Sequence, residues 1–205
     1  MNLSVPIMLH DLHKSCSKGS INGRVFKRGY VMEHEKKEIL FTRSVIDKRV
    51  QELADMISRD YQGKELMVIG ILKGAFIFMA DLIRSLQIAC TVDFVRLASY
   101  GSKTVSSEQI VITKDIEVSI KGRDVLVVED IVDTGLTLSY LVNRLKEREP
   151  QTLKVCVFLD KNERRKVAFE ADYVGFHIED RFVVGYGLDY NEMFRFLPDI
   201  YVIEE

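Results

Sequence analysis

Apolar residues recur along the chain with two different periods, and each period predicts its own element. In residues 45–61 they recur every three or four positions, which predicts an amphipathic helix lying on a core. Short apolar runs typical of buried strands occupy residues 65–72, 91–100, 125–128 and 153–160. Helical patterns cover residues 74–86 and 136–148 between these runs. Because strands and helices alternate from residue 65 to residue 160, the sequence predicts an α/β fold, a central parallel sheet flanked by helices.

The pattern changes after residue 160. Residues 171–178 and 182–190 are strand-like, but the few polar residues between them are too short for a crossover helix. We therefore expect a small C-terminal flap, antiparallel or irregular, over one edge of the sheet. Earlier in the chain, residues 108–113 suit the return arm of a hairpin, and the small, polar residues 101–107 before them could form a mobile lid.

Length and composition suit one globular domain. The chain has 205 residues, of which 47% are apolar and 29% are charged. Residues 41–205 are expected to form a single domain. In residues 1–40 glycine, serine and asparagine interrupt every periodicity, so we expect an N-terminal arm of unknown role.

Charge and hydropathy limit the kinds of partner that the protein is expected to bind. A net charge of −2 gives no electrostatic footprint for nucleic acid or for an anionic membrane. No segment approaches the roughly 18 to 20 uninterrupted apolar residues of a membrane span, and no basic leader precedes the short apolar stretch at the N-terminus. The three widely spaced cysteines are expected to be reduced thiols. We therefore expect a soluble cytoplasmic protein that binds neither nucleic acid nor membranes.

Three carboxylates follow the apolar run at residues 125–128, namely Glu129, Asp130 and Asp133. Ligands of open α/β sheets gather at the carboxyl ends of the strands, which predicts a site at this point. Glu129 and Asp130 could accept hydrogen bonds from sugar hydroxyls. Like charges this close repel each other, so the pair needs cations or ligand donors nearby.

A strand-to-helix junction follows, with Asp133, Thr134, Gly135 and Thr137. Glycine lets the backbone approach a ligand closely, and free N–H groups with hydroxyls can cradle a phosphate. The alternative is that Asp133 and Thr134 merely cap the next helix, a use worth about 1 kcal/mol. The chain lacks the GxxxxGKS/T and GxGxxG signatures, which disfavours a nucleoside triphosphatase and a dinucleotide oxidoreductase.

Residues 125–137, VLVVEDIVDTGLT, resemble the phosphoribosyl pyrophosphate (PRPP) binding motif of the type I phosphoribosyltransferases. Further stretches are similar to the hypoxanthine-guanine phosphoribosyltransferases within that family, at residues 72–84, 91–101, 158–165 and 182–195. The likeness is collinear over roughly residues 40–205. It implies the type I phosphoribosyltransferase fold, with residues 161–195 contributing a purine-binding hood. It also implies purine salvage, in which the 5-phosphoribosyl group passes from PRPP to N9 of hypoxanthine or guanine with Mg²⁺, giving IMP or GMP and pyrophosphate.

The resemblance also implies roles for the residues of the motif. Glu129 and Asp130 would hold the ribose hydroxyls of PRPP, and residues 133–137 would bind its 5′-phosphate. Asp133 would be the catalytic group that accepts the proton of purine N7. Metal binding would fall to Glu129, Asp130 and Asp189, the last through water molecules on Mg²⁺.

Residues distant from the motif match the family's pyrophosphate site and lid. Lys73 and Gly74 match a pyrophosphate loop in which the peptide before the lysine can be cis. Arg195 matches a second pyrophosphate ligand. Ser99 and Tyr100 match a lid that closes over the reacting centre and excludes water.

The purine site is expected at the C-terminal stretches. Lys161 matches the lysine that recognises purine O6, Phe182 an aromatic that stacks on the base, and Val183 a residue that contacts the base edge through its backbone; Asp189 belongs to the same group. Without the resemblance, composition favours an exposed lysine at position 161 and a core aromatic at position 182. Tyr186 is expected in the core.

The chain departs from its relatives at two positions. Leu136 stands where some of them carry a lysine in the phosphate loop, so that extra cation is absent. Asn162 stands where others carry a proline after the purine lysine. Neither departure removes a group with a predicted catalytic role.

Two alternative functions stay open. A xanthine- or guanine-preferring enzyme would use the same Lys161, because all 6-oxopurines share O6. A PRPP-sensing regulator on the same fold would bind nucleic acid and should show a basic face or an added binding module. For the enzyme we expect a homodimer or a homotetramer.

Overall fold

The structure is a computed structural model that describes residues 37–100 and 109–203. Residues 1–36 of the expected arm and the predicted lid tract, residues 101–107, lie outside the described residues. The other predicted lid residues, Ser99 and Tyr100, are described only by their backbone, which ends a strand. The fold therefore concerns the expected domain and the last residues of the expected arm.

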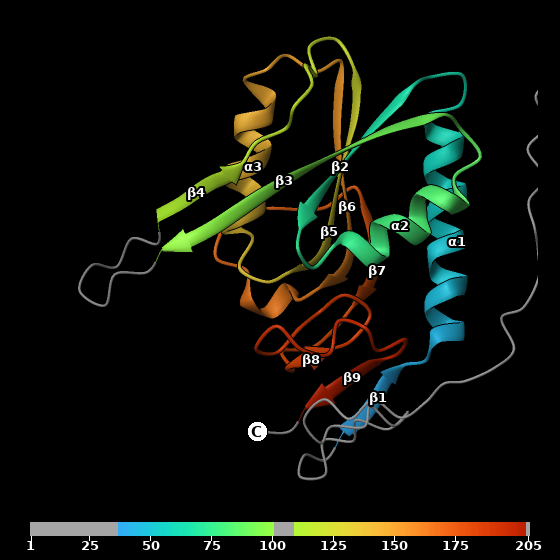
Figure 1. The fold of residues 1–205 in the computed structure, drawn as a ribbon, viewed down its shortest axis with the longest axis vertical. Coiled ribbons are helices and arrows are strands. Elements are labelled where there is room, and N and C mark those ends of the chain that lie inside the picture. The colour runs from blue at the N-terminus through green and yellow to red at the C-terminus, as the bar shows by residue number, and fades with distance from the viewer. Residues whose placement is uncertain (1–36, 101–108, 204–205) are drawn as a thin grey trace, which may run out of the picture. The chain divides into compact units, whose positions relative to one another are not determined.

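A six-stranded sheet forms the centre of the described part of the chain (Figure 1). In spatial order its strands are β4 (Gln109–Lys114), β3 (Cys90–Tyr100), β2 (Leu66–Leu72), β5 (Asp124–Val132), β6 (Thr152–Asp160) and β7 (Tyr173–His177). The strands from β3 to β7 are parallel, and β4 pairs antiparallel with β3. The predicted central parallel sheet and the predicted hairpin are confirmed.

Helices cover both faces of this sheet, and they are α1 (Arg43–Asp60), α2 (Phe76–Ser85) and α3 (Leu136–Lys146). In β5, Leu126 and Val128 belong to the apolar cluster that contains α1 and α2. The alternate residues Val125 and Val127 belong to the cluster that contains α3. A strand buried on both faces needs apolar side chains at every position, which explains the continuous run in its sequence. None of the described helices has both the length and the apolarity to cross a membrane.

A second, antiparallel sheet has the order β1 (Lys37–Phe41), β9 (Ile200–Ile203) and β8 (Val183–Val184). Figure 1 shows it beyond one end of the main sheet. Residues of β9 line a cavity together with Lys161, which directly follows β6, so this is the carboxyl end of the parallel strands. Strand β1 spans the expected boundary at residue 40 and ties that part of the chain to the C-terminal strand.

The expectation that residues 171–178 form part of a flap is wrong. They contain β7, which pairs in parallel with β6 as the last strand of the main sheet. The crossover lies in residues 161–172, which hold only the short 3-10 helix η1 (Asn162–Arg164). Parallel strands need a connection of about a dozen residues, and that connection need not be an α-helix. The small sheet takes only β8 from the two segments assigned to the flap.

Candidate active site

Glu129 and Asp130 lie near the carboxyl end of β5, which runs between β2 and β6. Glu129 is buried, with 8% of its surface exposed, and its Oε1 accepts a hydrogen bond from the backbone N–H of Asp130 at 3.1 Å. Oδ1 of Asp130 accepts a hydrogen bond from the N–H of Ile131 at 3.0 Å. The strand therefore carries two adjacent carboxylates to the edge of the sheet where a ligand is expected.

The environment of this acid pair disfavours negative charge. Burial raises the pKa of Glu129 well above its usual range, and the nearby charge of Asp130 raises this pKa further. No positive side chain of the described residues is among the groups that act on this pKa. Carboxylate oxygens suit a hard cation such as Mg²⁺ and accept hydrogen bonds from hydroxyls. The pair therefore fits a ligand that brings cations or hydroxyl donors.

This pKa shift predicts a gain in stability when Glu129 is replaced by glutamine. Because the pKa is higher in the folded chain than in the unfolded chain, the contribution of Glu129 to stability falls as the pH rises above the unfolded value of about 4.3. At pH 8 and without ligand, E129Q should be more stable by about 1 kcal/mol, or about 2–4 °C in Tm. The difference should shrink at pH 5 in thermal melts; an equal difference at both pH values would contradict it.

The predicted phosphate loop, residues 133–137, joins β5 to α3. Gly135 has a φ of 79°, a left-handed conformation that glycine adopts without strain, and it has no side chain to cap the helix. Thr134 Oγ1 accepts only a long hydrogen bond, 3.4 Å, from the N–H of Leu136. A cavity of about 190 Å³ lies against this loop and the acid pair. The first N–H groups of α3 have no partner within the helix, so the loop suits an anion.

Asp133 contacts an arginine rather than the helix. Its Oδ2 forms an ion pair with Arg164 Nη1 at 3.1 Å, and its Oδ1 is buried without a hydrogen-bond partner in the described part of the chain. The alternative in which Asp133 merely caps α3 is therefore not supported by the geometry. A buried acceptor without a partner is costly in a folded protein, which makes Oδ1 a candidate contact for a ligand N–H group.

The predicted pyrophosphate loop follows β2, the neighbour of β5. The peptide between Leu72 and Lys73 is cis, as expected. A Cβ atom on Gly74 would overlap the carboxylate of Asp130, and a Cβ atom on Gly187 would overlap the carbonyl oxygen of Gly74. The structure therefore packs the Lys73–Gly74 turn between the acid pair and the segment after β8.

The segment after β8 supplies a carboxylate partner to each of the two positively charged residues predicted to bind pyrophosphate, Lys73 and Arg195. Lys73 Nζ lies 2.6 Å from Glu192 Oε2, and Arg195 forms an ion pair with Asp189. Arg195 Nη1 also donates a hydrogen bond to the carbonyl of Gly187 at 2.6 Å. The four charged side chains thus form two pairs, and an anionic ligand would have to replace one carboxylate in each.

The predicted metal ligands do not gather into one set. Asp189 accepts a hydrogen bond from the N–H of Glu192 at 2.8 Å and pairs with Arg195. Among the described residues, no three His, Cys, Asp or Glu side chains come close enough to hold a metal ion by themselves. A metal shared between Asp189 and the acid pair would need oxygen ligands from a substrate, a common arrangement for Mg²⁺.

Two of the predicted purine residues, Lys161 and Phe182, line a separate cavity of about 430 Å³ that β9 also borders, whereas Val183 and Asp189 are not in its lining. Lys161 is only 6% exposed, and its Nζ lies 3.6 Å from Asp180 Oδ1. Phe182 is 41% exposed and meets the ring of Tyr190 edge-on, with centroids 5.5 Å apart. Val183 is buried in β8. Composition alone favours the opposite, an exposed lysine and a core phenylalanine.

Four site residues were not predicted from the sequence: Arg164, Asp180, Gly187 and Glu192. Arg164 bridges Asp133 and Asp180, with its Nε 3.6 Å from Asp180 Oδ2. All four lie within or beside the stretches 158–165 and 182–195 that carry the resemblance. For Arg164, Asp180 and Glu192, the available signal was a charge near a predicted site residue. Gly187 had no such signal, because only the fold shows its close approach to Gly74.

Comparisons with known proteins agree with this geometry. The profile of the phosphoribosyl transferase domain family matches residues 39–191. The hypoxanthine-guanine phosphoribosyltransferase of Aquifex aeolicus is 48% identical over 172 residues, which cover 83% of this chain and 97% of that protein. The enzyme of the same name from Bacillus subtilis is 45% identical over 174 residues, which cover 85% of this chain and 97% of that protein.

Solved structures give the same result. The crystal structure of a hypoxanthine phosphoribosyltransferase from Staphylococcus aureus matches with a TM-score of 0.82 and 43% identity, covering 87% of this chain and 97% of that one. A hypoxanthine-guanine phosphoribosyltransferase from Bacillus anthracis matches with a TM-score of 0.78 and 46% identity, covering 82% and 98%. The chain therefore belongs to the phosphoribosyl transferase domain family and, within it, to the hypoxanthine-guanine phosphoribosyltransferases.

Proposed function

We propose that this enzyme transfers the 5-phosphoribosyl group from PRPP to N9 of hypoxanthine or guanine and releases pyrophosphate. The observation that carries the proposal is the packing of three elements at one sheet edge. The acid pair of β5, the Gly135 loop and the Lys73–Gly74 turn meet there. Together they offer hydroxyl acceptors, an anion cradle and a cation, which match the ribose, the 5′-phosphate and the pyrophosphate of PRPP.

The ribose and its 5′-phosphate are assigned to β5 and the loop that follows it. Glu129 and Asp130 would accept hydrogen bonds from the two ribose hydroxyls, which also relieves the repulsion between their charges. The N–H groups at the start of α3, with the hydroxyls of Thr134 and Thr137, would bind the 5′-phosphate. Gly135 keeps the backbone open for this contact.

The leaving group is assigned to Lys73 and Arg195. Pyrophosphate oxygens would replace their present partners, Glu192 and Asp189. The positive charges of Lys73 and Arg195 would then be neutralised by pyrophosphate instead of by these carboxylates. Glu129, Asp130 and Asp189 would hold Mg²⁺ together with substrate oxygens. Bound there, Mg²⁺ would lower the negative charge on the departing pyrophosphate.

The transfer forms one bond to C1′ and breaks another, and one proton moves from the base to the enzyme. N9 of the base bonds to C1′ of the ribose, while the bond from C1′ to pyrophosphate breaks and its electron pair leaves with pyrophosphate. The proton on N7 passes to Asp133, whose buried Oδ1 has no partner within residues 37–100 and 109–203. Positive character on the ribose is tolerated because Glu129 and Asp130 lie beside it. A lid that includes Ser99 and Tyr100 would keep water from the same centre.

The base is assigned to the cavity between Lys161 and β9. Lys161 would donate to O6, Phe182 would stack on the ring, and the backbone at Val183 would contact the edge of the base. The burial of Lys161 and the exposure of Phe182 support this assignment, because neither is the usual state of its residue type.

Replacing Lys161 with alanine should harm base recognition more than PRPP binding. The loss of one hydrogen bond to a charged group predicts a rise of about 10- to 100-fold in KM for the base. KM for PRPP should change by less than about threefold, because the cation lies on the base side of the site. Lys154→Ala is the matched control, since this lysine lies on β6, the strand that Lys161 directly follows, but pairs with Asp60 at 2.9 Å. Equal losses for both substrates would contradict the assignment.

The function is tested by initial rates with PRPP, Mg²⁺ and single bases: hypoxanthine, guanine, xanthine, adenine and uracil. Turnover of hypoxanthine or guanine supports the proposal. A preference for xanthine would favour the related enzyme that shares the O6 contact. Turnover of adenine or uracil alone would overturn the purine assignment.

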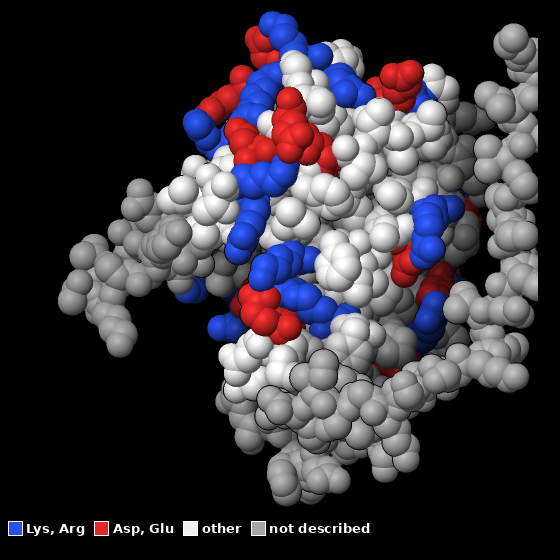
Figure 2. Space-filling view, viewed as in Figure 1, with Lys and Arg blue, Asp and Glu red and all other residues white. Residues whose placement is uncertain are grey.

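A PRPP-sensing regulator is the alternative from another class, and it would turn over none of these bases. Such a protein should carry a continuous basic face. On the described part of the face in Figure 2, Lys and Arg side chains are interspersed with Asp and Glu. With a net charge of −2, the chain favours the enzyme.

A further inference from the structure

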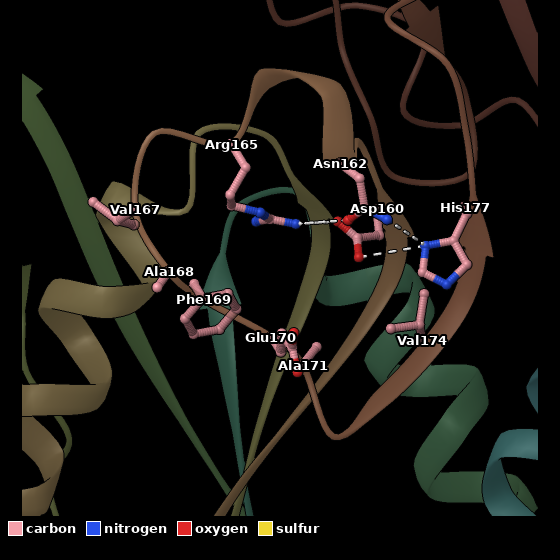
Figure 3. A pocket seen from close by; sticks show the side chains of 10 residues that line it. All are labelled: Asp160, Asn162, Arg165, Val167, Ala168, Phe169, Glu170, Ala171, Val174 and His177. Atoms are coloured by element: carbon pink, nitrogen blue, oxygen red, sulfur yellow. Dashed lines mark hydrogen bonds and ion pairs between the residues drawn. The ribbon is translucent and has the colours of Figure 1, made fainter.

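A largely buried ion pair lies beside the phosphate loop and has no part in the proposed chemistry. Asp160, the last residue of β6, is 5% exposed and forms an ion pair with Arg165 Nη2. Its other oxygen lies 3.5 Å from His177 Nδ1. Figure 3 shows the guanidinium of Arg165 and the carboxylate of Asp160 facing each other in the wall of a cavity of about 700 Å³. The pair is therefore built into the crossover between β6 and β7.

Arg165 also touches the backbone of the phosphate loop. A Cβ atom on Gly135 would lie 3.0 Å from Arg165 Cδ and 3.2 Å from Arg165 Nη1, so the arginine side chain packs directly against this glycine. The added Cβ atom would also lie 3.2 Å from Val167 Cγ2. Between them, the N–H of Lys166 donates to the carbonyl of Thr134 at 3.0 Å. Residues 165–167 thus form a wall behind the loop, called here the loop wall.

The two terminal nitrogens of the Arg165 guanidinium differ in their contacts. Nη2 pairs with Asp160, whereas Nη1 is buried and has no hydrogen-bond partner among the described residues. The ring of Phe169 lies 5.8 Å from Arg165 Cζ and restricts the side chain further. A buried carboxylate such as Asp160 binds its partner firmly, and the planar fork of arginine fixes the direction in which the second nitrogen points. Arg165 therefore holds a positive charge in a fixed place beside Gly135.

The phosphate loop itself has no cation. Residues 133–137 are Asp, Thr, Gly, Leu and Thr, and Leu136 stands where some relatives carry a lysine. Gly135 has no side chain that could hold the loop in place. The backbone N–H and carbonyl groups of the loop are therefore positioned by the residues packed against them, the loop wall. A positive charge behind the loop also favours an anion in front of it.

We propose that Arg165, held by Asp160, is a positioning residue that fixes the phosphate loop and supplies the positive charge that the loop lacks. This inference rests on the proposed function, since it assumes that the loop binds the 5′-phosphate of PRPP. Arg165 acts through the loop backbone and takes no part in the transfer of the phosphoribosyl group.

The first test is Arg165→Gln, which keeps a polar side chain and removes the charge. KM for PRPP should rise by about tenfold or more, because small displacements of a binding loop have effects of this size. KM for hypoxanthine should stay within about twofold, since the base cavity has its own walls. Binding of a nucleoside 5′-monophosphate should weaken by about tenfold, and binding of the matching nucleoside should not change. A merely structural role would weaken both compounds alike.

Asp160→Asn is the second test, because it keeps the shape of the buried side chain and releases Arg165 from its anchor. It should raise KM for PRPP in the same direction, and the double variant should cost no more than Arg165→Gln alone. Arg148→Gln is the matched control, since Arg148 pairs with Asp115 at 2.5 Å beyond the other end of α3. It should leave both KM values unchanged.

The result that overturns the inference is an unchanged KM for PRPP in Arg165→Gln, or equal weakening of nucleotide and nucleoside. Additive effects in the double variant would also overturn it, because they would mean that Asp160 does not act through Arg165. If Arg165→Gln fails to fold, Asp160→Asn alone decides between the same outcomes. Absence of turnover in the unmodified protein would instead reject the proposed function.

Discussion

Replacement of Asp133 by asparagine is expected to lower kcat by about 10² or more while PRPP still binds. Asparagine keeps the size of the side chain and can still contact Arg164, so the loop should hold its position. An amide cannot accept the proton that leaves N7, and proton transfer to a positioned base contributes about 10²–10⁴ to a rate. The measurement is kcat at saturating substrates, together with the dissociation constant of PRPP.

Asp115→Asn is the control for Asp133→Asn. Asp115 also pairs with an arginine, Arg148, at 2.5 Å, but it follows β4 and lies outside the proposed site. Its kcat should equal that of the unmodified protein. An unchanged kcat in Asp133→Asn would remove Asp133 from the role of proton acceptor, whereas a parallel loss of PRPP affinity would mean that its contact with Arg164 matters more than proton transfer.

The sheet could be predicted from the sequence because its strands are buried on two faces. In β5 the residues that face α1 and α2 and the residues that face α3 are all apolar, and such a run differs clearly from a helix in its length and its flanks. The position of β7 in the main sheet could not be predicted in the same way. Its pairing with β6 depends on a crossover without an α-helix, and no periodicity marks such a connection.

The site could be predicted where chemistry is local. The acids of β5 and the glycine of the phosphate loop lie within seven consecutive positions, 129–135, so one motif predicts them together. The charged partners of the site residues are not local, and two of them show why. Glu192 reaches Lys73 across 119 positions, and Arg164 reaches Asp133 from the next crossover. Only the folded chain brings such pairs together, because local periodicity carries no information on distant contacts.

The burial of Lys161 is a second feature beyond sequence reasoning. Lysines are mostly exposed, yet this one is buried at the end of β6, where its N–H donates to the carbonyl of Val132 at 3.0 Å. That bond ties the first residue of the crossover to the last residue of β5. The segment proposed to bind the base and the strand that leads into the proposed phosphate loop therefore share a backbone hydrogen bond that no sequence motif reveals.

Gly74→Ala is expected to lower kcat/KM for PRPP by about 10² while the protein stays folded. The added Cβ would overlap the carboxylate of Asp130. Strand β5 is paired with β2 as far as Val128 and with β6 as far as Val132, which holds its backbone in place, so we expect the carboxylate to rotate away. An acid displaced in this way would no longer face the proposed position of the ribose. The measurement is kcat/KM for PRPP, with thermal melting to follow the fold.

Gly63→Ala separates this loss from a general effect of alanine. Gly63 has a φ of 76° and nothing within 4 Å of an added Cβ, so alanine there should cost about 1 kcal/mol of stability and leave kcat/KM unchanged. Gly74→Ala should therefore lose activity and stay folded, whereas Gly63→Ala should lose stability and keep its activity. Asp130→Ala completes the argument, because it removes the group that Gly74→Ala displaces. If the clash acts through Asp130, the double variant should be no less active than Asp130→Ala alone, and a further loss would place the role of Gly74 in its own backbone instead.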